Sequence, residues 1–281
     1  MDESNEVPAH LHESRITMPA HASHGLAVGH GSIPSPCPVP RSWAFGDGQG
    51  SGVRVCIVDS GVDVSHPAVG AGVSTYRVEV GSESDGFLVV PDDAGDVAGH
   101  GTACASIVRA LAPGCELTSL RVLGGALRGR GDALVAALRW AVTAGYDLIN
   151  LSLSTRHPDF RDAIRDLSDQ AYFGGTTIVA AAHNRPIASF PWRFPAVISV
   201  GSHARPDRER IEVNPTPPVE FFALGVDVLA AQPTNGWARL SGNSFATPHV
   251  TGMCARILGS HPEFRTPQLK MVLAAIADNL N

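Results

Sequence analysis

Three short segments of the 281-residue sequence contain side chains that could transfer a proton or attack a carbonyl carbon. Asp59 closes one apolar run, His100 stands between two glycines before another, and Ser244 lies within residues 241–250. Each residue alone has an ordinary explanation as a turn cap, a packed histidine or a helix N-cap. Together, a carboxylate, an imidazole and a hydroxyl are the groups that activate a serine nucleophile.

The order of the three residues along the chain is informative. Aspartate, histidine, serine is the order found in subtilisin, and it differs from the orders in chymotrypsin and the α/β-hydrolases. The hydrolase signature G-x-S-x-G is absent, because Ala246 occupies its last position. From about residue 53 to the carboxyl end, the sequence resembles the subtilisin-like serine peptidases (subtilases). This resemblance implies that Ser244 is the nucleophile, His100 the general base and acid, and Asp59 the carboxylate that orients the histidine.

A fourth segment, residues 180–184, resembles the subtilase segment whose asparagine donates a hydrogen bond to the oxyanion. The resemblance assigns this role to Asn184, together with the backbone N–H of Ser244. The alternative is that Asn184 is a turn residue before Pro186. Asn243 stands where subtilases usually have a threonine whose hydroxyl assists the oxyanion, so we expect that contribution to be altered, although an amide can also donate.

The pocket for the substrate side chain that precedes the scissile bond departs from the family pattern. Two segments resemble its walls, and they supply the predicted substrate-binding residues Ser152, Leu153, Ser154, Ala182 and His183. Ser154 and His183 stand where glycine is usual, and Arg185 follows closely. The larger side chains and the added charge predict a preference for a small or acidic residue. The alternative is that these side chains point to solvent and change little.

The elements that must position these residues follow from the hydrophobic pattern. Short apolar runs predict buried strands at 53–58, 119–123, 148–153, 177–181 and 197–200. Helical patterns lie between and after them. The predicted helices begin at His100, at an N-cap Asp132 (ending at Gly145), near Asp159 (ending at 174–175), at Ser244 (with Pro248 in the first turn, ending near Gly259) and at a capping Thr266 before Pro267.

Apolar strands that alternate with helices indicate a parallel sheet covered on both faces. We therefore predict an α/β protein with the three-layer subtilisin-like fold, in which a mostly parallel central sheet has helices on both faces. Sites in such sheets form at the carboxyl ends of the strands.

Residues 1–50 differ from the remainder of the chain. They contain five histidines and a proline cluster without sustained periodicity, which predicts an extended N-terminal arm or a short pro-segment laid over the cleft. The alternative is a disordered or partner-binding extension. Residues 51–281 are predicted to form the peptidase domain.

Composition excludes several classes of protein. A net charge of −6 argues against a nucleic-acid binder, and no apolar stretch approaches the roughly 18 residues of a membrane span. Five cysteines without a C-x-x-C pair, and an acidic amino terminus without a following apolar region, predict a cytoplasmic protein. The oligomeric state is not indicated.

No cofactor or metal is predicted. The resemblance implies that a calcium ligand would follow His66–Pro67, where this sequence has Ala68. Cys104 lies one helical turn after His100, and its counterpart in proteinase K-like subtilases implies sensitivity to mercurials. The simpler interpretation of Cys104 is a small buried apolar residue.

The predicted function is a serine endopeptidase that hydrolyses peptides or proteins through an acyl-enzyme intermediate. A narrower hypothesis is a dedicated maturation peptidase, or a macrocyclase, that acts on a ribosomal peptide. A hypothesis from another class is a non-catalytic subtilase-like module that binds peptides. Such a module would have no need of Asp59, His100, Ser244 and Asn184 together.

Overall fold

The computed structural model describes residues 15–17, 39–81 and 86–280. Among these residues, nine strands form one sheet, in the spatial order β10 (Ile211–Val213), β11 (Phe221–Leu224), β9 (Ile198–His203), β8 (Thr177–Ala181), β7 (Leu148–Leu151), β2 (Arg54–Asp59), β5 (Glu116–Arg121), β3 (Ser74–Val80) and β4 (Phe87–Pro91). Every neighbouring pair from β11 to β3 is parallel, and the two outermost pairs are antiparallel. The predicted mostly parallel sheet is confirmed.

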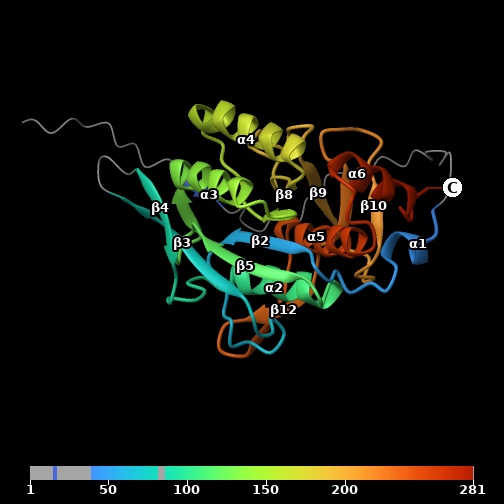
Figure 1. The fold of residues 1–281 in the computed structure, drawn as a ribbon, viewed down its shortest axis with the longest axis horizontal. Coiled ribbons are helices and arrows are strands. Elements are labelled where there is room, and N and C mark those ends of the chain that lie inside the picture. Colours follow the sequence, from blue (N-terminus) through green and yellow to red (C-terminus); the bar gives the residue numbers. More distant parts are fainter. Residues whose placement is uncertain (1–14, 18–38, 82–85, 281) are drawn as a thin grey trace, which may run out of the picture.

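Helices cover both faces of this sheet. One face is packed against α2 (His100–Leu111), α5 (Asn243–Ser260) and α6 (Thr266–Ala275), and the other against α3 (Gly131–Thr143) and α4 (Arg161–Gly174). Strand β2 shows why two cores form, since Val55 and Ile57 enter the first and Cys56 and Val58 the second. Figure 1 shows α3 and α4 on the side of the sheet opposite to α2. The predicted three-layer α/β fold is confirmed.

The predicted start of α3 is wrong by two residues. The helix begins at Gly131, so Asp132 lies inside its first turn and is not the N-cap. The carboxylate of Asp132 accepts the N–H of Ala133 and pairs with Arg130, which places negative charge at the positive end of the helix dipole. The predicted stop is confirmed within one residue, because α3 ends at Thr143 and Gly145 adopts φ +67°.

Two further helix starts differ from the prediction. Thr266 is the first residue of α6 and not its cap, since the backbone N–H of Arg265 donates to the Gln268 side chain. Helix α5 begins at Asn243, so Pro248 falls in its second turn and not in its first. Helix α4 is preceded by a short 3-10 turn, η1 (Pro158–Phe160).

The smaller elements lie around the sheet. They are α1 (Arg41–Phe45), the pair β1 (Arg15–Thr17) and β6 (Arg128–Arg130), and the pair β12 (Val228–Gln232) and β13 (Gly236–Leu240). Strand β1 pairs antiparallel with β6. The predicted N-terminal arm falls largely on residues 1–14 and 18–38, which lie outside the described residues, so the domain division at residue 50 stays a prediction.

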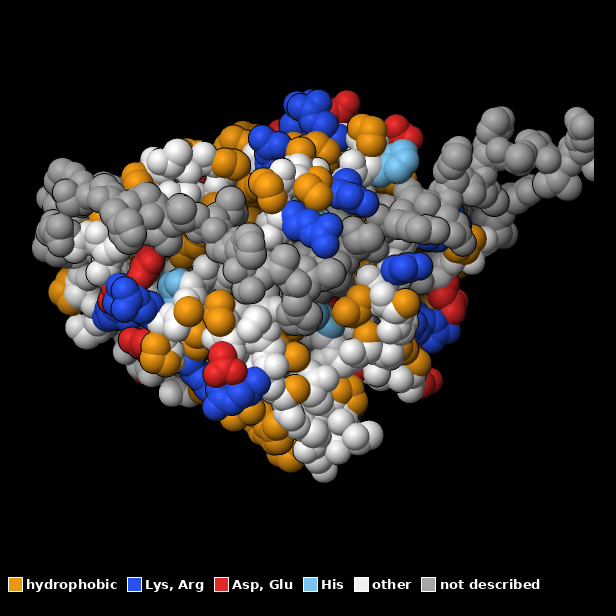
Figure 2. Space-filling model, turned by 180° about the vertical axis from the view of Figure 1, so that it is seen from behind, with side chains coloured by type: hydrophobic (Ala, Val, Ile, Leu, Met, Phe, Trp, Pro, Cys, Tyr) orange, Lys and Arg blue, Asp and Glu red, His pale blue; other side chains and the backbone are white. Residues whose placement is uncertain are grey.

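The surface of the described residues shows mixed charge. On the face drawn in Figure 2, the lysine and arginine side chains lie in separate small groups, several of them beside acidic side chains. Among the described residues, no helix is both long and apolar enough to cross a membrane.

Candidate active site

Three of the predicted site residues lie at the carboxyl ends of neighbouring parallel strands. Asp59 is the last residue of β2, Ser152 follows the last residue of β7, and Asn184 comes three residues after β8. Because the strands are adjacent and parallel, these three residues share one edge of the sheet.

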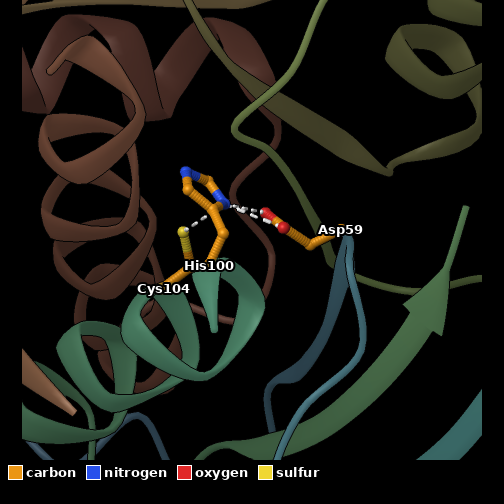
Figure 3. A group of neighbouring side chains, drawn as sticks. All are labelled: Asp59, His100 and Cys104. Atoms are coloured by element: carbon orange, nitrogen blue, oxygen red, sulfur yellow. Dashed lines mark hydrogen bonds and ion pairs between the residues drawn. The ribbon is translucent and has the colours of Figure 1, made fainter. Parts of the chain in front are cut away.

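The carboxylate of Asp59 faces the imidazole of His100 at hydrogen-bonding distance. The His100 Nδ1 atom lies 2.8 Å from Asp59 Oδ1 and 2.9 Å from Oδ2, and both residues are buried (Figure 3). Helix α2 approaches β2 this closely because residue 101 is glycine. A Cβ atom there would lie 2.0 Å from the Gly61 carbonyl oxygen, which explains why a glycine follows the histidine.

Asp96 holds the first turn of α2 in place, although its role was not predicted from the sequence. Its Oδ2 atom accepts hydrogen bonds from the backbone N–H and the hydroxyl of Thr102. Its Oδ1 atom accepts from the Gly99 N–H and the Ser60 hydroxyl. A short-range signal was present, because an aspartate four residues before His100 is well placed to bond the free N–H groups at a helix start.

Pro248 shapes the surroundings of Ser244. In an α-helix, the carbonyl of Ser244 would accept the N–H of residue 248, but proline has none. The Ser152 hydroxyl donates to this carbonyl instead, at 2.7 Å, and the Cys104 sulfur lies 3.6 Å from it. The hydroxyl of Ser152 is therefore committed to the backbone of Ser244 and is not free to meet a substrate.

The buried thiol of Cys104 lies close to both Ser244 and His100. Cys104 Sγ is 3.8 Å from His100 Nδ1, besides its contact with the Ser244 carbonyl, and the ring of Phe245 lies 5.1 Å from the ring of His100. The Ser244 hydroxyl donates to the Ser152 carbonyl at 3.1 Å. The His100 Nε2 atom is buried and has no hydrogen-bond partner among the described residues, so it is available to accept a proton when the imidazole is neutral.

The electrostatics of the pair favour a protonated imidazole. Burial lowers the pKa of His100, but the adjacent Asp59 carboxylate outweighs it and holds the pKa well above its ordinary value. Burial raises the pKa of the Cys104 thiol, so the thiol remains protonated at neutral pH.

Asn184 lies against the turn that precedes the serine. Its Oδ1 atom accepts the backbone N–H of Asn243 at 2.9 Å, which leaves Nδ2 as the outward donor. Gly242 has φ +150°, and a Cβ atom on it would lie 3.3 Å from that Nδ2. The side chain of Asn243 donates to the Ala182 carbonyl at 3.0 Å, so one of its two N–H bonds is already used.

The predicted pocket walls consist of buried side chains. Leu153, Ser154, Ala182 and His183 are all buried, so the alternative that Ser154 and His183 point to solvent is wrong. His183 Nδ1 accepts the backbone N–H of Arg185 at 3.0 Å. Burial lowers the pKa of His183, and the charges of two exposed arginines act in the same direction, those of Arg156 and Arg185.

A chain of buried polar groups behind Ser152 was missed in the sequence. Thr251 donates to Asn150 Oδ1 at 2.9 Å, and Asn150 Nδ2 donates to the Ser152 hydroxyl at 3.1 Å. The chain ends on the carbonyl of Ser244. The available signal was Asn150 itself, a fully buried amide within an otherwise apolar strand, which needs partners.

The same region contains the candidate metal ligands found among the described residues. One atom each of Asp59, His100 and Cys104 lie within 4.8 Å of one another. The nitrogen that such a site would use, His100 Nδ1, already faces the Asp59 carboxylate. The hydrogen-bonded pair and a metal ion would therefore compete for the same atom.

The fold and the site together define a class of protein. An α/β sheet whose carboxyl edge holds a buried carboxylate–imidazole pair beside a helix-start serine is the arrangement of a serine hydrolase. A model of the subtilase family matches residues 50–281, so the chain belongs to this family and is a subtilisin-like serine peptidase.

Curated relatives agree with this assignment. The chain is 32% identical to subtilisin DY of Bacillus licheniformis over 247 residues, which cover 83% of this chain and 86% of the relative. It is 29% identical to subtilisin E of Bacillus subtilis (strain 168) over 248 residues, covering 82% of this chain and 62% of the relative. It is 28% identical to alkaline elastase YaB of Bacillus sp. (strain YaB), covering 86% of this chain and 63% of the relative.

Proposed function

We propose that the chain cleaves internal peptide bonds with Ser244 as nucleophile, His100 as general base and acid, and Asp59 as the orienting carboxylate. The observation that carries this proposal is the buried contact of His100 Nδ1 with both oxygens of Asp59, at 2.8 and 2.9 Å, while Nε2 lacks a partner. A base whose second nitrogen is fixed by a carboxylate has one tautomer, and in that tautomer Nε2 accepts a proton.

Acylation requires the Ser244 hydroxyl to change its hydrogen-bond partner. The Ser244 hydroxyl turns from the Ser152 carbonyl, which it meets at 3.1 Å, toward His100 Nε2. It then attacks the substrate carbonyl carbon while Nε2 takes its proton. The negative oxygen that forms receives hydrogen bonds from Asn184 Nδ2 and from the backbone N–H of Ser244, at the positive end of the α5 dipole.

Collapse of this first tetrahedral intermediate forms the acyl-enzyme. His100 gives its proton to the leaving amine, which departs as the tetrahedral intermediate collapses to an ester on Ser244. A water molecule then attacks the ester while the neutral imidazole takes its proton. The imidazolium returns that proton to the Ser244 oxygen as the second product leaves as a carboxylic acid. Asp59 remains ionised and stabilises the imidazolium at each stage.

Steady-state hydrolysis of a peptide substrate tests these roles. Ser244→Ala and His100→Ala should each reduce kcat by about 10⁶. The double variant should be no slower than either single variant, because the two side chains act as one unit. Additive losses, or a Ser244→Ala protein that keeps more than a hundredth of the activity, would refute the assignment.

For the specificity pocket, we propose a preference for small or acidic side chains. The support is the burial of His183 and Ser154, which take up space, and the two exposed arginines whose charge acts on His183. A series of substrates with aspartate, alanine or phenylalanine before the scissile bond tests this. We expect phenylalanine to be the poorest, and we expect Arg185→Glu to lower kcat/KM for the aspartate substrate alone. Equal rates for all three would refute the preference.

For the part of residues 1–50 that precedes α1, we propose a pro-segment that competes with substrate, whereas α1 remains, because Ala44 and Phe45 are buried in the core. The support is the antiparallel pairing of β1 with β6, which puts a segment of the chain's own amino-terminal region on an edge strand seven to nine residues after the end of β5. Strand β5 ends beside Asp59, since the N–H of Val122 donates to the Asp59 carbonyl at 2.8 Å. Strand addition of this kind is how extended peptides bind sheet edges.

Mass analysis after incubation distinguishes this from a permanent extension. The wild-type protein should lose the segment and gain activity with time, whereas Ser244→Ala should keep it. Ile16→Pro, which removes one backbone donor from β1, should shorten the lag. Retention of the segment by an active wild-type protein, with no lag, would refute the proposal.

The cytoplasmic location and the maturation or macrocyclase role stay predictions. In support of a reducing compartment, Cys56, Cys104, Cys115 and Cys254 are buried and free. Peptide products analysed by mass distinguish hydrolysis from cyclisation, because a cyclic product lacks one water. The non-catalytic module would give neither product.

A further inference from the structure

A cavity behind the proposed catalytic residues has no part in the mechanism above. Its volume is about 330 Å³, within the range of small-molecule sites. Ile107 and Ala110 of α2 line it, as does His249 of α5. Ile107 and Ala110 follow His100 by seven and ten residues, so they lie about 10–15 Å along the helix from the imidazole. The cavity is therefore separate from the cleft.

One side of the cavity is an apolar wall with an aromatic rim. Val228, Leu229 and Trp237, from β12 and β13, line it. The indole of Trp237 is 56% exposed, yet it is held by an edge contact with the His66 ring, whose centroid is 5.3 Å away. His66 is fixed in turn by its hydrogen bond to the Gly236 carbonyl. An exposed aromatic ring held by such a contact is a good partner for an apolar ligand.

The polar lining of the cavity is cationic. Arg109 and Arg208 both line it, and none of the described lining residues is acidic. The Nε and Nη1 atoms of Arg109 donate to backbone carbonyls, which fixes its guanidinium. Arg208 is exposed and has no hydrogen bond or ion pair with another described residue. In a protein of net charge −6, two arginines without an acidic partner in one cavity favour an anionic ligand.

His249 adds a hydrogen-bond acceptor. Its Nδ1 atom donates to the Phe245 carbonyl at 2.8 Å. Burial lowers the pKa of His249 to about 4, and the charge of Arg208 contributes, so the ring is neutral at pH 7. In that tautomer Nε2 is an acceptor, and no hydrogen bond joins it to another described residue. A ligand that fills the cavity would therefore need one N–H or O–H group to donate a hydrogen bond to His249 Nε2.

We propose that this cavity binds a small carboxylate with an apolar body and one N–H group, of which an N-acylated apolar amino acid is the simplest example. The carboxylate pairs with Arg208, the N–H donates to His249 Nε2, and the side chain packs against Val228 and Trp237. The same chemistry occurs at the carboxyl terminus of a peptide that ends in an apolar residue. The proposal does not depend on the roles assigned to the catalytic residues.

Ligand-observed NMR titration of the full-length Ser244→Ala protein with N-acetyl-L-leucine tests this site. We expect saturable binding, weakened about tenfold by Arg208→Gln, which removes a charge-assisted hydrogen bond. Ala110→Leu, an exposed helix position that tolerates leucine, should fill the cavity and abolish binding. Arg165→Gln, an exposed arginine of α4, is the matched control and should leave the Kd unchanged.

Two further arms make the outcome decisive. N-acetyl-L-leucinamide lacks the carboxylate and should bind at least tenfold more weakly. An N-acetylated tetrapeptide ending in leucine should bind with the same Kd as N-acetyl-L-leucine if the cavity admits the carboxyl terminus of a peptide. It should bind more weakly if the cavity accepts only a single N-acylated amino acid. Absence of saturable binding would overturn the proposal. Binding that Arg185→Gln weakens, but Arg208→Gln and Ala110→Leu do not, would place the probe in the substrate cleft and would equally overturn it.

Discussion

Replacement of Ser152 by alanine tests how the sequence holds the proposed nucleophile in place. The Ser152 hydroxyl donates to the Ser244 carbonyl at 2.7 Å and accepts from Asn150 Nδ2 at 3.1 Å. Because Pro248 cannot donate to that carbonyl, the variant leaves it only the weak contact with the Cys104 thiol at 3.6 Å. It also leaves the Asn150 amide without an acceptor for Nδ2.

The magnitude follows from these two losses. A buried polar group without its partner costs about 1–3 kcal/mol, so we expect the free energy of unfolding to fall by roughly 2–4 kcal/mol. The carbonyl belongs to the nucleophile itself, so the position of its hydroxyl should also loosen. We expect kcat to fall about tenfold, which corresponds to about 1.4 kcal/mol of activation free energy, with KM nearly unchanged.

Two matched variants separate positioning from general stability. Ser168→Ala removes another buried hydroxyl that donates to a backbone carbonyl, that of Ile164, but this carbonyl lies in the regular helix α4. This variant should leave kcat unchanged and should lower the free energy of unfolding by no more than about 1 kcal/mol. Pro248→Ala, added to Ser152→Ala, supplies an N–H for the Ser244 carbonyl and should restore part of both losses.

The assays are urea unfolding and steady-state hydrolysis at one substrate and pH. A Ser152→Ala protein that is destabilised but keeps its wild-type kcat would show that the polar chain stabilises the fold without positioning Ser244. A double variant with no recovery would show that the missing proline N–H is irrelevant. Either result would refute the reasoning.

Three further predictions concern the site and its metal independence. Asn184→Ala should lower kcat by 10²–10³, the cost known for a comparable donor in subtilisin, with little change in KM, and a loss below fivefold would contradict its role. His100 can act as the base only when its imidazole is neutral. Because the effect of Asp59 on the pKa of His100 exceeds that of burial, this pKa is raised, so kcat/KM should rise tenfold per pH unit and level off only well above pH 6.5. Because the pKa of His100 is higher in the folded than in the unfolded protein, protonation of its imidazole stabilises the fold below pH 6.5. This contribution to the free energy of unfolding is lost as the pH rises through the raised pKa. A rate profile that is flat from pH 6 upward would contradict this. Removal of divalent ions by a chelator should leave the thermal midpoint unchanged, since Ala68 replaces the expected calcium ligand, and a fall of several degrees would reveal a metal site.

Local patterns were sufficient to predict the positions of the site segments. Asp59 lies at the end of an apolar strand and His100 at the start of an apolar helix, so the parallel-sheet rule placed them at one edge. Strands β2, β5, β7, β8 and β9 were predicted, in part of their length, because each contains or adjoins a short buried apolar stretch. The strands of the central sheet that were missed are β3, β4, β10 and β11, and the two small pairs β1/β6 and β12/β13 were missed as well.

Those strands were missed because their patterns are weak or short. Strands β3 and β4 lie toward one edge of the sheet and are mostly half-exposed, and β4 ends in a proline. Strand β10 has three residues and β11 four, too few for periodicity to distinguish them from loops.

Interactions between distant segments could not be predicted. The hydroxyl of Ser152 meets a carbonyl 92 residues away, which is free only because of Pro248. The sequence suggested a substrate-binding role for Ser152, whereas the structure commits its side chain to the turn that carries the serine. Similarly, nothing local indicated that His183 would be buried beside the charge of Arg156.

Covalent labelling with a fluorophosphonate probe tests the central assignment most directly. The probe reacts only with a serine whose proton a neighbouring base removes, so its site of attachment identifies the nucleophile. Peptide mapping of the labelled wild-type protein should place a single phosphonate on Ser244, and Ser244→Ala and His100→Ala should remain unlabelled. A phosphonate on another residue, or equal labelling of the His100→Ala protein, would contradict the account.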